Sequence, residues 1–200
     1  MGTRHAELQR VRVSKPRRAD PTHIERNRGL RRSTLSRYAV LPEPIREALA
    51  RIEPSGEHEL PSYPCRVKLK NGGVLERVLI VPERQYIRYW GVCPEDDKAK
   101  RSIRIEDILQ IEESPVRLPA RFADEIYRAG ESGMGGTTFI VVFADGSRQA
   151  YSAGGVCDFL SYPPGKGPAD VSEVLPQEGR WDALVAVPEH YWCLYSASDT

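Results

Sequence analysis

Apolar residues recur with a helical period in two short segments of the chain. In residues 42–53, Ile45, Leu49 and Ile52 have the spacing of one helical face, and Pro44 lies near the start. We therefore expect a short amphipathic helix over about 42–53.

The same arrangement returns in the second half of the sequence. Leu118, Phe122 and Ile126 again share one helical face, and Gly130 suits the residue that ends a helix. This pattern predicts a second short helix over about 119–129.

Apolar and polar residues alternate after the first helix, over residues 65–70, as in a strand with one buried face and one basic face. Asn71-Gly72 predicts a hairpin turn, because both residues tolerate a positive φ. Two registers remain open, which oppose Leu69 with either Val74 or Leu75.

After the second helix, residues 139–143 are apolar at every position, which indicates a strand covered on both faces. Asp145-Gly146 predicts its turn. Closing segments follow in both halves, residues 102–114 and 169–179, and each carries apolar residues three apart.

Each half thus has a helix, a hairpin and a closing segment. The sequence predicts an α+β fold of mainly antiparallel strands, with the two helices packed on small curled sheets. One form of this fold is a tandem duplication of an SH3-like small barrel. The predicted sub-domains are residues 39–116 and 117–200, which could also pack as one domain.

The net charge of +1 hides an asymmetry along the chain. Residues 1–38 hold eleven Lys and Arg against three acidic residues and have few large apolar residues. We expect a disordered basic arm there, while the rest of the chain carries a net charge of −7.

Composition narrows the class of protein. No apolar run is long enough to span a membrane, and the basic N-terminus lacks the apolar stretch of a secretory signal. The four cysteines, Cys65, Cys93, Cys157 and Cys193, contain no close pair of the kind that binds metal. We expect a cytoplasmic, bacterial protein without membrane partner, metal or cofactor.

Two stretches of sequence resemble each other, VLIVPERQYIRYWG at 78–91 and ALVAVPEHYWCLYS at 183–196. We expect each Val-Pro-Glu to mark a break between two strands. Arg and aromatic residues, which are enriched at binding hot spots, gather only in the first. The candidate binding residues are Arg84, Tyr86, Arg88, Tyr89 and Trp90. On a strand, Tyr86, Arg88 and Trp90 would share one face, which also suits an ordinary half-buried sheet.

The leading functional hypothesis is a non-catalytic binding protein that acts through a protein–protein surface, such as an immunity or antitoxin-like inhibitor. The alternative is a nucleic-acid-associated protein that uses the basic arm. Its candidate residues are Arg17, Arg18, Arg31, Arg32, Arg66, Lys68 and Lys70. A third hypothesis is a small hydrolase or transferase with Cys157 or Cys93 as nucleophile and His190 as base, although no local sequence signature supports catalysis.

Overall fold

The computed structural model describes residues 37–56 and 60–197. It contains three α-helices: α1 (Glu43–Leu49), α2 (Glu83–Trp90) and α3 (Ala120–Ala129). The strands are β1 (Tyr63–Leu69), β2 (Val74–Pro82), β3 (Arg101–Ser102), β4 (Ile108–Glu113), β5 (Thr137–Phe143), β6 (Arg148–Ala153), β7 (Val171–Pro176), β8 (Val185–Ala186) and β9 (Tyr191–Tyr195). Short 3-10 turns cover Pro94–Asp96 (η3), Ile105–Asp107 (η4) and Pro168–Asp170 (η5).

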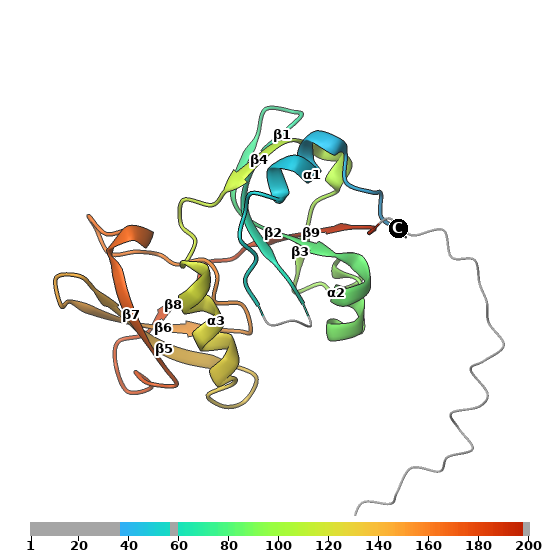
Figure 1. Cartoon of the computed structure of the whole chain (residues 1–200). Coiled ribbons are helices and arrows are strands. Elements are labelled where there is room, and N and C mark those ends of the chain that lie inside the picture. The colour runs from blue at the N-terminus through green and yellow to red at the C-terminus, as the bar shows by residue number, and fades with distance from the viewer. Residues whose placement is uncertain (1–36, 57–59, 198–200) are drawn as a thin grey trace, which may run out of the picture. The chain divides into compact units, whose positions relative to one another are not determined.

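The strands form two mixed sheets (Figure 1). The first has the order β3-β9-β2-β1-β4, and the second has the order β7-β5-β6-β8. The hairpins β1–β2 and β5–β6 are antiparallel, and the closing strands β4 and β7 pair antiparallel with β1 and β5. In contrast, β9 runs parallel to β2 and β3, and β8 runs parallel to β6. The α+β class is confirmed, and neither sheet closes into a barrel within residues 37–56 and 60–197.

Next to its turn the first hairpin adopts neither of the two registers that the sequence left open, whereas from Cys65 onward it has the register that would oppose Leu69 with Val74. Lys68 faces Val74, while Cys65 faces Val78, with an irregularity between Cys65 and Val67. Arg66 of β1 therefore opposes both Glu76 and Arg77 of β2, which is a β-bulge. No single uninterrupted register could have satisfied both ends of this hairpin.

The two sheets share one plan of pairing. The series β4-β1-β2-β9 in the first corresponds to β7-β5-β6-β8 in the second, including the parallel strand at the end. Equivalent backbone hydrogen bonds occur beside the two hairpin turns. The amide of Lys70 donates to the carbonyl of Asp107, and the amide of Ala144 donates to the carbonyl of Asp170, both at 2.8 Å. Each half therefore fastens its hairpin to a 3-10 turn in the same way.

Matching irregularities explain why apolar residues lie three apart in the closing strands. The register shifts at the start of β4 and again at the start of β7. At each shift the closing strand contains one extra residue, so the next side chain that points to the core comes three residues later instead of two. Ile108 and Ile111 in β4, and Val171 and Val174 in β7, are consequently all buried.

The two predicted helices are confirmed. Helix α1 begins after Pro42 and buries Ile45 and Leu49, and α3 begins after Pro119 and buries Phe122 and Ile126. Helix α1 contacts β4, and α3 contacts the equivalent strand β7. The apolar stripe of each helix thus packs on its own sheet, as its spacing predicts.

The prediction of a strand after the first Val-Pro-Glu is wrong. Glu83–Trp90 is helix α2, which begins after Pro82 and ends at Gly91 with a φ of 73°. A proline before the first turn, an acidic residue in that turn and a glycine in the left-handed region all favour a helix. The faces change accordingly, because Tyr86 and Trp90 stay together while Arg88 turns outward.

The second Val-Pro-Glu does mark a break between strands. Residues 187–190 separate β8, which belongs to the second sheet, from β9, which belongs to the first. Val78 pairs with Tyr191 and Pro82 with Tyr195, so the strands of the two similar stretches lie side by side in parallel.

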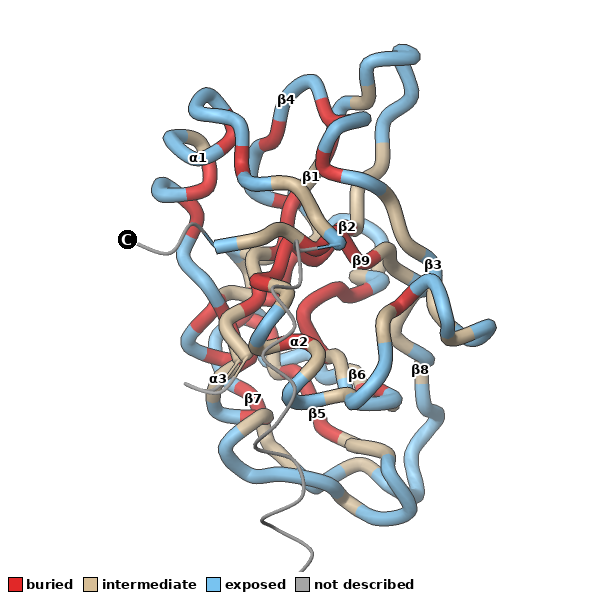
Figure 2. Tube along the Cα trace, turned by 90° about the vertical axis from the view of Figure 1, so that its right-hand side faces the viewer, coloured by how far each residue is buried: buried red, intermediate tan, exposed pale blue. Residues whose placement is uncertain are grey.

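Three groups of buried apolar residues hold these elements together. One lies between α1 and the first sheet, and a second lies between α3 and the second sheet. The third comprises Leu79, Val81, Tyr86, Phe159, Trp192 and Leu194. Figure 2 shows the buried stretches of β2 and β9 that contribute to these groups.

Candidate functional site

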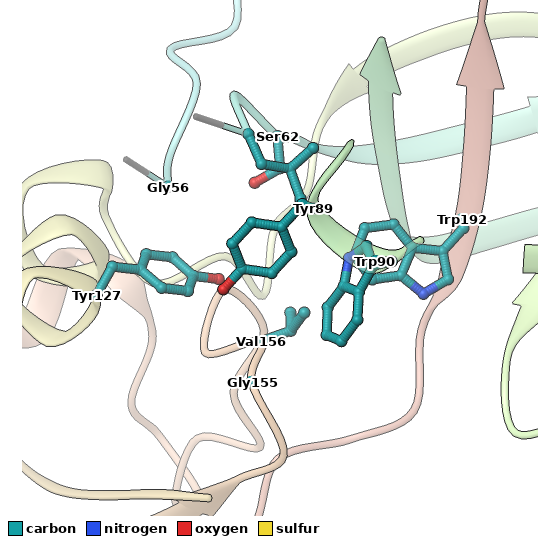
Figure 3. Close-up of a pocket in the computed structure, with 9 residues that line it drawn as sticks. Gly56, Ser62, Tyr89, Trp90, Tyr127, Gly155, Val156 and Trp192 are labelled. Carbon is teal, nitrogen blue, oxygen red and sulfur yellow. The ribbon is translucent and has the colours of Figure 1, made fainter. Parts of the chain in front are cut away.

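A small pocket lies at the C-terminal end of α2 (Figure 3). We call it the aromatic pocket; it encloses about 100 Å³. Its lining comes from α2, α3, β9 and two loops, and comprises Gly56, Leu60, Ser62, Tyr89, Trp90, Tyr127, Gly155, Val156 and Trp192. Residues that are far apart in the sequence therefore meet at one site.

Four of the residues that line the aromatic pocket are aromatic. The hydroxyl ends of Tyr89 and Tyr127 face each other, while Trp90 and Trp192 lie beyond Tyr89 (Figure 3). Tyr89 is 58% exposed, and its ring lies edge-on to Trp90 with a centroid separation of 5.2 Å. An aromatic ring that is open to solvent above a concave site is available to a partner.

A buried polar network supports the tyrosine side of the pocket. The hydroxyls of Tyr127 and Ser55 donate hydrogen bonds to opposite oxygens of the fully buried Asp158 carboxylate. Burial raises the pKa of Asp158, while these hydrogen bonds and the charge of Arg117 act in the opposite direction. The network ties α3 to the loop that carries Ser55.

Lys100 also lies against Trp90. Its Nζ is 3.7 Å from the Trp90 ring centroid, 5.2 Å from that of Tyr86 and 5.9 Å from that of Trp192. We call these three rings the aromatic cage. Burial lowers the pKa of Lys100, opposed by the Asp97 carboxylate at 3.6 Å.

His190 lies beside the aromatic cage. Its ring is edge-on to Trp192 at 5.1 Å, and its buried Nε2 has no hydrogen-bond partner among the described residues. Burial, followed by the charges of Arg77 and Lys100, lowers the pKa of His190 to about 4. The imidazole is therefore neutral at physiological pH.

The five predicted binding residues divide into three groups on α2. Tyr86 is buried within the aromatic cage, Tyr89 and Trp90 line the aromatic pocket, and Arg84 and Arg88 have exposed side chains. The structure thus brings Tyr89 and Trp90 to a common site. Whether any of the five binds a partner stays a prediction.

The basic face of β1 is partly neutralised by its neighbours. Arg66 forms ion pairs with Glu76 at 3.1 Å and with Glu112 at 2.9 Å. Lys68 and Lys70 are exposed. The other nucleic-acid candidates, Arg17, Arg18, Arg31 and Arg32, lie outside the described residues, as does the predicted arm except for Arg37 and Tyr38.

The two candidate nucleophiles have different surroundings. Cys157 is buried, its thiol lies 3.9 Å from the carbonyl of Ala123, and burial raises its pKa well above the ordinary value. Such a thiol is a poor nucleophile, because the thiolate is disfavoured. Cys93 is partly exposed, and no hydrogen bond joins either thiol to His190 within the described ranges.

The described residues contain no group of three or more His, Cys, Asp or Glu side chains that could hold a metal ion. No helix in residues 37–56 and 60–197 has both the length and the apolar content that crossing a bilayer requires.

Comparison with known proteins identifies no relative: the chain matches no protein-family model, no curated protein and no solved structure. The assignment of function therefore rests on the residues themselves.

Several residues of the site were not candidates from the sequence. Tyr127, Asp158, Lys100 and Trp192 join it from four separate segments of the chain. Trp192 lies in the second of the two similar stretches, which offered one signal. Lys100 offered none, since its environment depends on rings from two distant elements, α2 and β9.

Proposed function

We propose that this chain is a non-catalytic protein-binding protein, and that the aromatic pocket is the centre of its binding face. The observation that carries the proposal is the position of Tyr89. This residue is 58% exposed and lines a concave site together with Trp90 and Tyr127. Large aromatic side chains in such places contribute most of the energy of many interfaces.

The dimensions of the pocket indicate how a partner would engage it. A volume of about 100 Å³ gives room for one inserted side chain. The apolar walls favour an aromatic or aliphatic side chain. We infer a protein partner that inserts one apolar anchor.

An immunity or antitoxin-like inhibitor is one specific form of this function. Residues 39–200 carry a net charge of −7, which suits a basic partner such as a nuclease. Charge complementarity of this kind accelerates association and selects among partners. If the protein is such an inhibitor, we expect its partner to be a basic enzyme.

The test is affinity capture from the host in which the protein occurs, with and without nuclease treatment. The chain is compared with Tyr89→Ala and with Trp181→Ala, because Trp181 is 92% exposed and does not line the aromatic pocket. We expect the unaltered chain to capture a stoichiometric protein partner, and nuclease treatment should leave this capture unchanged. Trp181→Ala should capture the same partner equally well. Tyr89→Ala should capture at least about tenfold less of it.

Each result decides between named alternatives. Equal capture by Tyr89→Ala and the unaltered chain would remove the aromatic pocket from the interface. Loss of all captured protein after nuclease treatment would favour the nucleic-acid hypothesis instead.

The exposure of Lys68 and Lys70 supports nucleic-acid binding as a second candidate function. We propose that these two residues and the basic residues of 1–38 contact phosphates. Binding of a labelled DNA duplex should then weaken steeply with salt, and replacement of Arg17, Arg18, Arg31 and Arg32 by Gln should reduce that slope. Binding that is insensitive to salt would contradict this candidate.

We also infer that the two halves of the chain are copies of one SH3-like unit. The shared strand series and the equivalent bonds of Lys70 and Ala144 support a duplication. Homologous sequences would test it. The sequence profile of residues 39–116 would be compared with that of residues 117–186, and shuffled sequences would serve as the control. A similarity no greater than that of the shuffled sequences would contradict the inference.

A further inference from the structure

The ammonium of Lys100 is surrounded by three aromatic rings that contact one another. The centroids of Tyr86 and Trp192 are 4.9 Å apart, those of Trp90 and Trp192 are 6.2 Å apart, and those of Tyr86 and Trp90 are 6.4 Å apart. Helix α2 and strand β9 supply the rings, so both walls of the aromatic cage belong to regular elements. Tyr86 and Trp192 are buried. The cage is thus a fixed feature of the fold.

The cage is suited to a cation that has no N–H groups. Ring faces attract positive charge, but they are not the acceptors that a primary ammonium requires. The carboxylate of Asp97 forms an ion pair with Lys100 Nζ at 3.6 Å, which is longer than an ordinary hydrogen bond. A primary ammonium is also strongly hydrated, so confinement among rings is costly for Lys100.

Lys100 comes from a short connection and not from one of the elements that supply the rings. It follows a turn in which Lys98 and Ala99 are exposed, and it precedes β3, a strand of only two residues. Beside the cage lies a second pocket of about 270 Å³, which Trp90, Lys100 and Trp192 all line. A ligand whose cationic group replaced Lys100 would have room for its remaining atoms there.

We propose that Tyr86, Trp90 and Trp192 form a binding site for a quaternary ammonium group, which Lys100 occupies until the ligand displaces it. A quaternary ammonium has no N–H groups to satisfy, and it gains the same attraction from the rings and from Asp97. The site shares Trp90 and Trp192 with the aromatic pocket, but Tyr86 and Lys100 do not line that pocket. It goes beyond the proposed protein-binding face because it recognises a cation.

The first test uses the full chain and choline chloride, with sodium chloride at equal ionic strength as the reference. The three tryptophans, Trp90, Trp181 and Trp192, give three indole N–H signals in a nitrogen-15 NMR spectrum. We expect saturable shifts of the Trp90 and Trp192 signals and no shift of the Trp181 signal, since Trp181 is 92% exposed and lies outside the cage. Equal shifts of all three signals would overturn the proposal.

The second test removes the competing lysine. The tethered ammonium competes with choline for the same rings, so Lys100→Ala should tighten choline binding by at least about twofold. The matched control is Lys98→Ala, which removes a lysine of the same turn and should leave the affinity unchanged. Unchanged affinity in Lys100→Ala would overturn the role of Lys100 as the occupant.

The third test separates charge from shape. The neutral analogue 3,3-dimethylbutan-1-ol has the shape of choline without its charge, and we expect it to bind at least about tenfold more weakly. Equal affinity would overturn recognition of the cation. Titration with N-acetyl-trimethyllysine amide distinguishes a modified side chain from a free small molecule as the source of the group. The absence of saturable shifts with both cations, in the full chain and in Lys100→Ala, would overturn the site altogether.

Discussion

The hydroxyl of Tyr127 donates a hydrogen bond to the carboxylate of Asp158, which also accepts one from Ser55. Removal of that carboxylate would leave the buried Ser55 hydroxyl without its acceptor. We expect Asp158→Ala to lower the free energy of unfolding by about 2–4 kcal/mol, as measured by urea denaturation. The exposed Asp182 provides the control, and Asp182→Ala should change stability by less than about 0.5 kcal/mol. Equal stability of the two variants would show that the network contributes nothing.

His190 should make stability depend on pH in the mildly acidic range. Its pKa in the folded chain is about 4, against an ordinary value of 6.5, so the unfolded chain binds the proton first. The contribution is complete above pH 6.5 and is lost as the pH falls from 6.5 to about 4. We expect the free energy of unfolding to fall by up to about 3 kcal/mol more in the unaltered chain than in His190→Gln. Urea denaturation at pH 7.5 and at pH 4 would measure the difference, and parallel pH profiles would contradict it.

Gly179 occupies a position where any side chain would collide. Its φ is 83°, and an added Cβ would lie 2.9 Å from Cγ1 of Ile140 and 3.0 Å from Cβ of Ala150. We expect Gly179→Ala to cost about 2–4 kcal/mol, the sum of backbone strain and overpacking. Gly165 has a φ of 76° with open space around it, so Gly165→Ala should cost only about 1–2 kcal/mol. Thermal unfolding of both variants compares the two costs, and equal losses would rule out the collision.

Tyr86 and Tyr89 should respond very differently to truncation, because α2 places them on different sides. Tyr86 is fully buried, and we expect Tyr86→Ala to lower the free energy of unfolding by about 3–5 kcal/mol. Tyr89 is 58% exposed, so Tyr89→Ala should cost less than about 1 kcal/mol. Denaturation curves of the two variants test this, and they also establish whether Tyr89→Ala is folded for the capture experiment. A large loss in Tyr89→Ala would contradict its exposed position.

The parts of the fold that local sequence could predict are those determined within one element. The spacing of Ile45 and Leu49 specifies the buried face of α1, and that of Phe122 and Ile126 specifies the buried face of α3. Asn71-Gly72 fixes the position of the first hairpin turn. In each case the decisive interactions lie within a few residues of one another.

Helix α2 shows where such reasoning is ambiguous. Tyr and Trp are common in strands, so RQYIRYW resembles an alternating strand when only the aromatic residues are considered. Pro82 before the segment and Gly91 after it carried the better signal, since together they are typical of helix ends. With the correct helix, Tyr86 and Trp90 come to one face, and both then contribute to the aromatic cage.

The candidate site was predictable only in part, for a related reason. The segment that contains Tyr89 and Trp90 stood out because its aromatic and arginine residues are close in sequence. Tyr127 and Lys100 join the site through the packing of separate elements, which no local pattern encodes. The parallel pairing of β9 with β2 is of the same kind, because it depends on contacts between residues more than a hundred positions apart.

That pairing also constrains the order in which the chain can fold during synthesis. Strand β9 lies between β3 and β2, so the first sheet lacks an inner strand until Tyr195 has been made. The second sheet uses only residues 137–186 and can form earlier. Contacts between such distant segments are slow to form, so β2 would wait as an unpaired edge while the later part of the chain folds. The half that is synthesised first is therefore the half that is completed last.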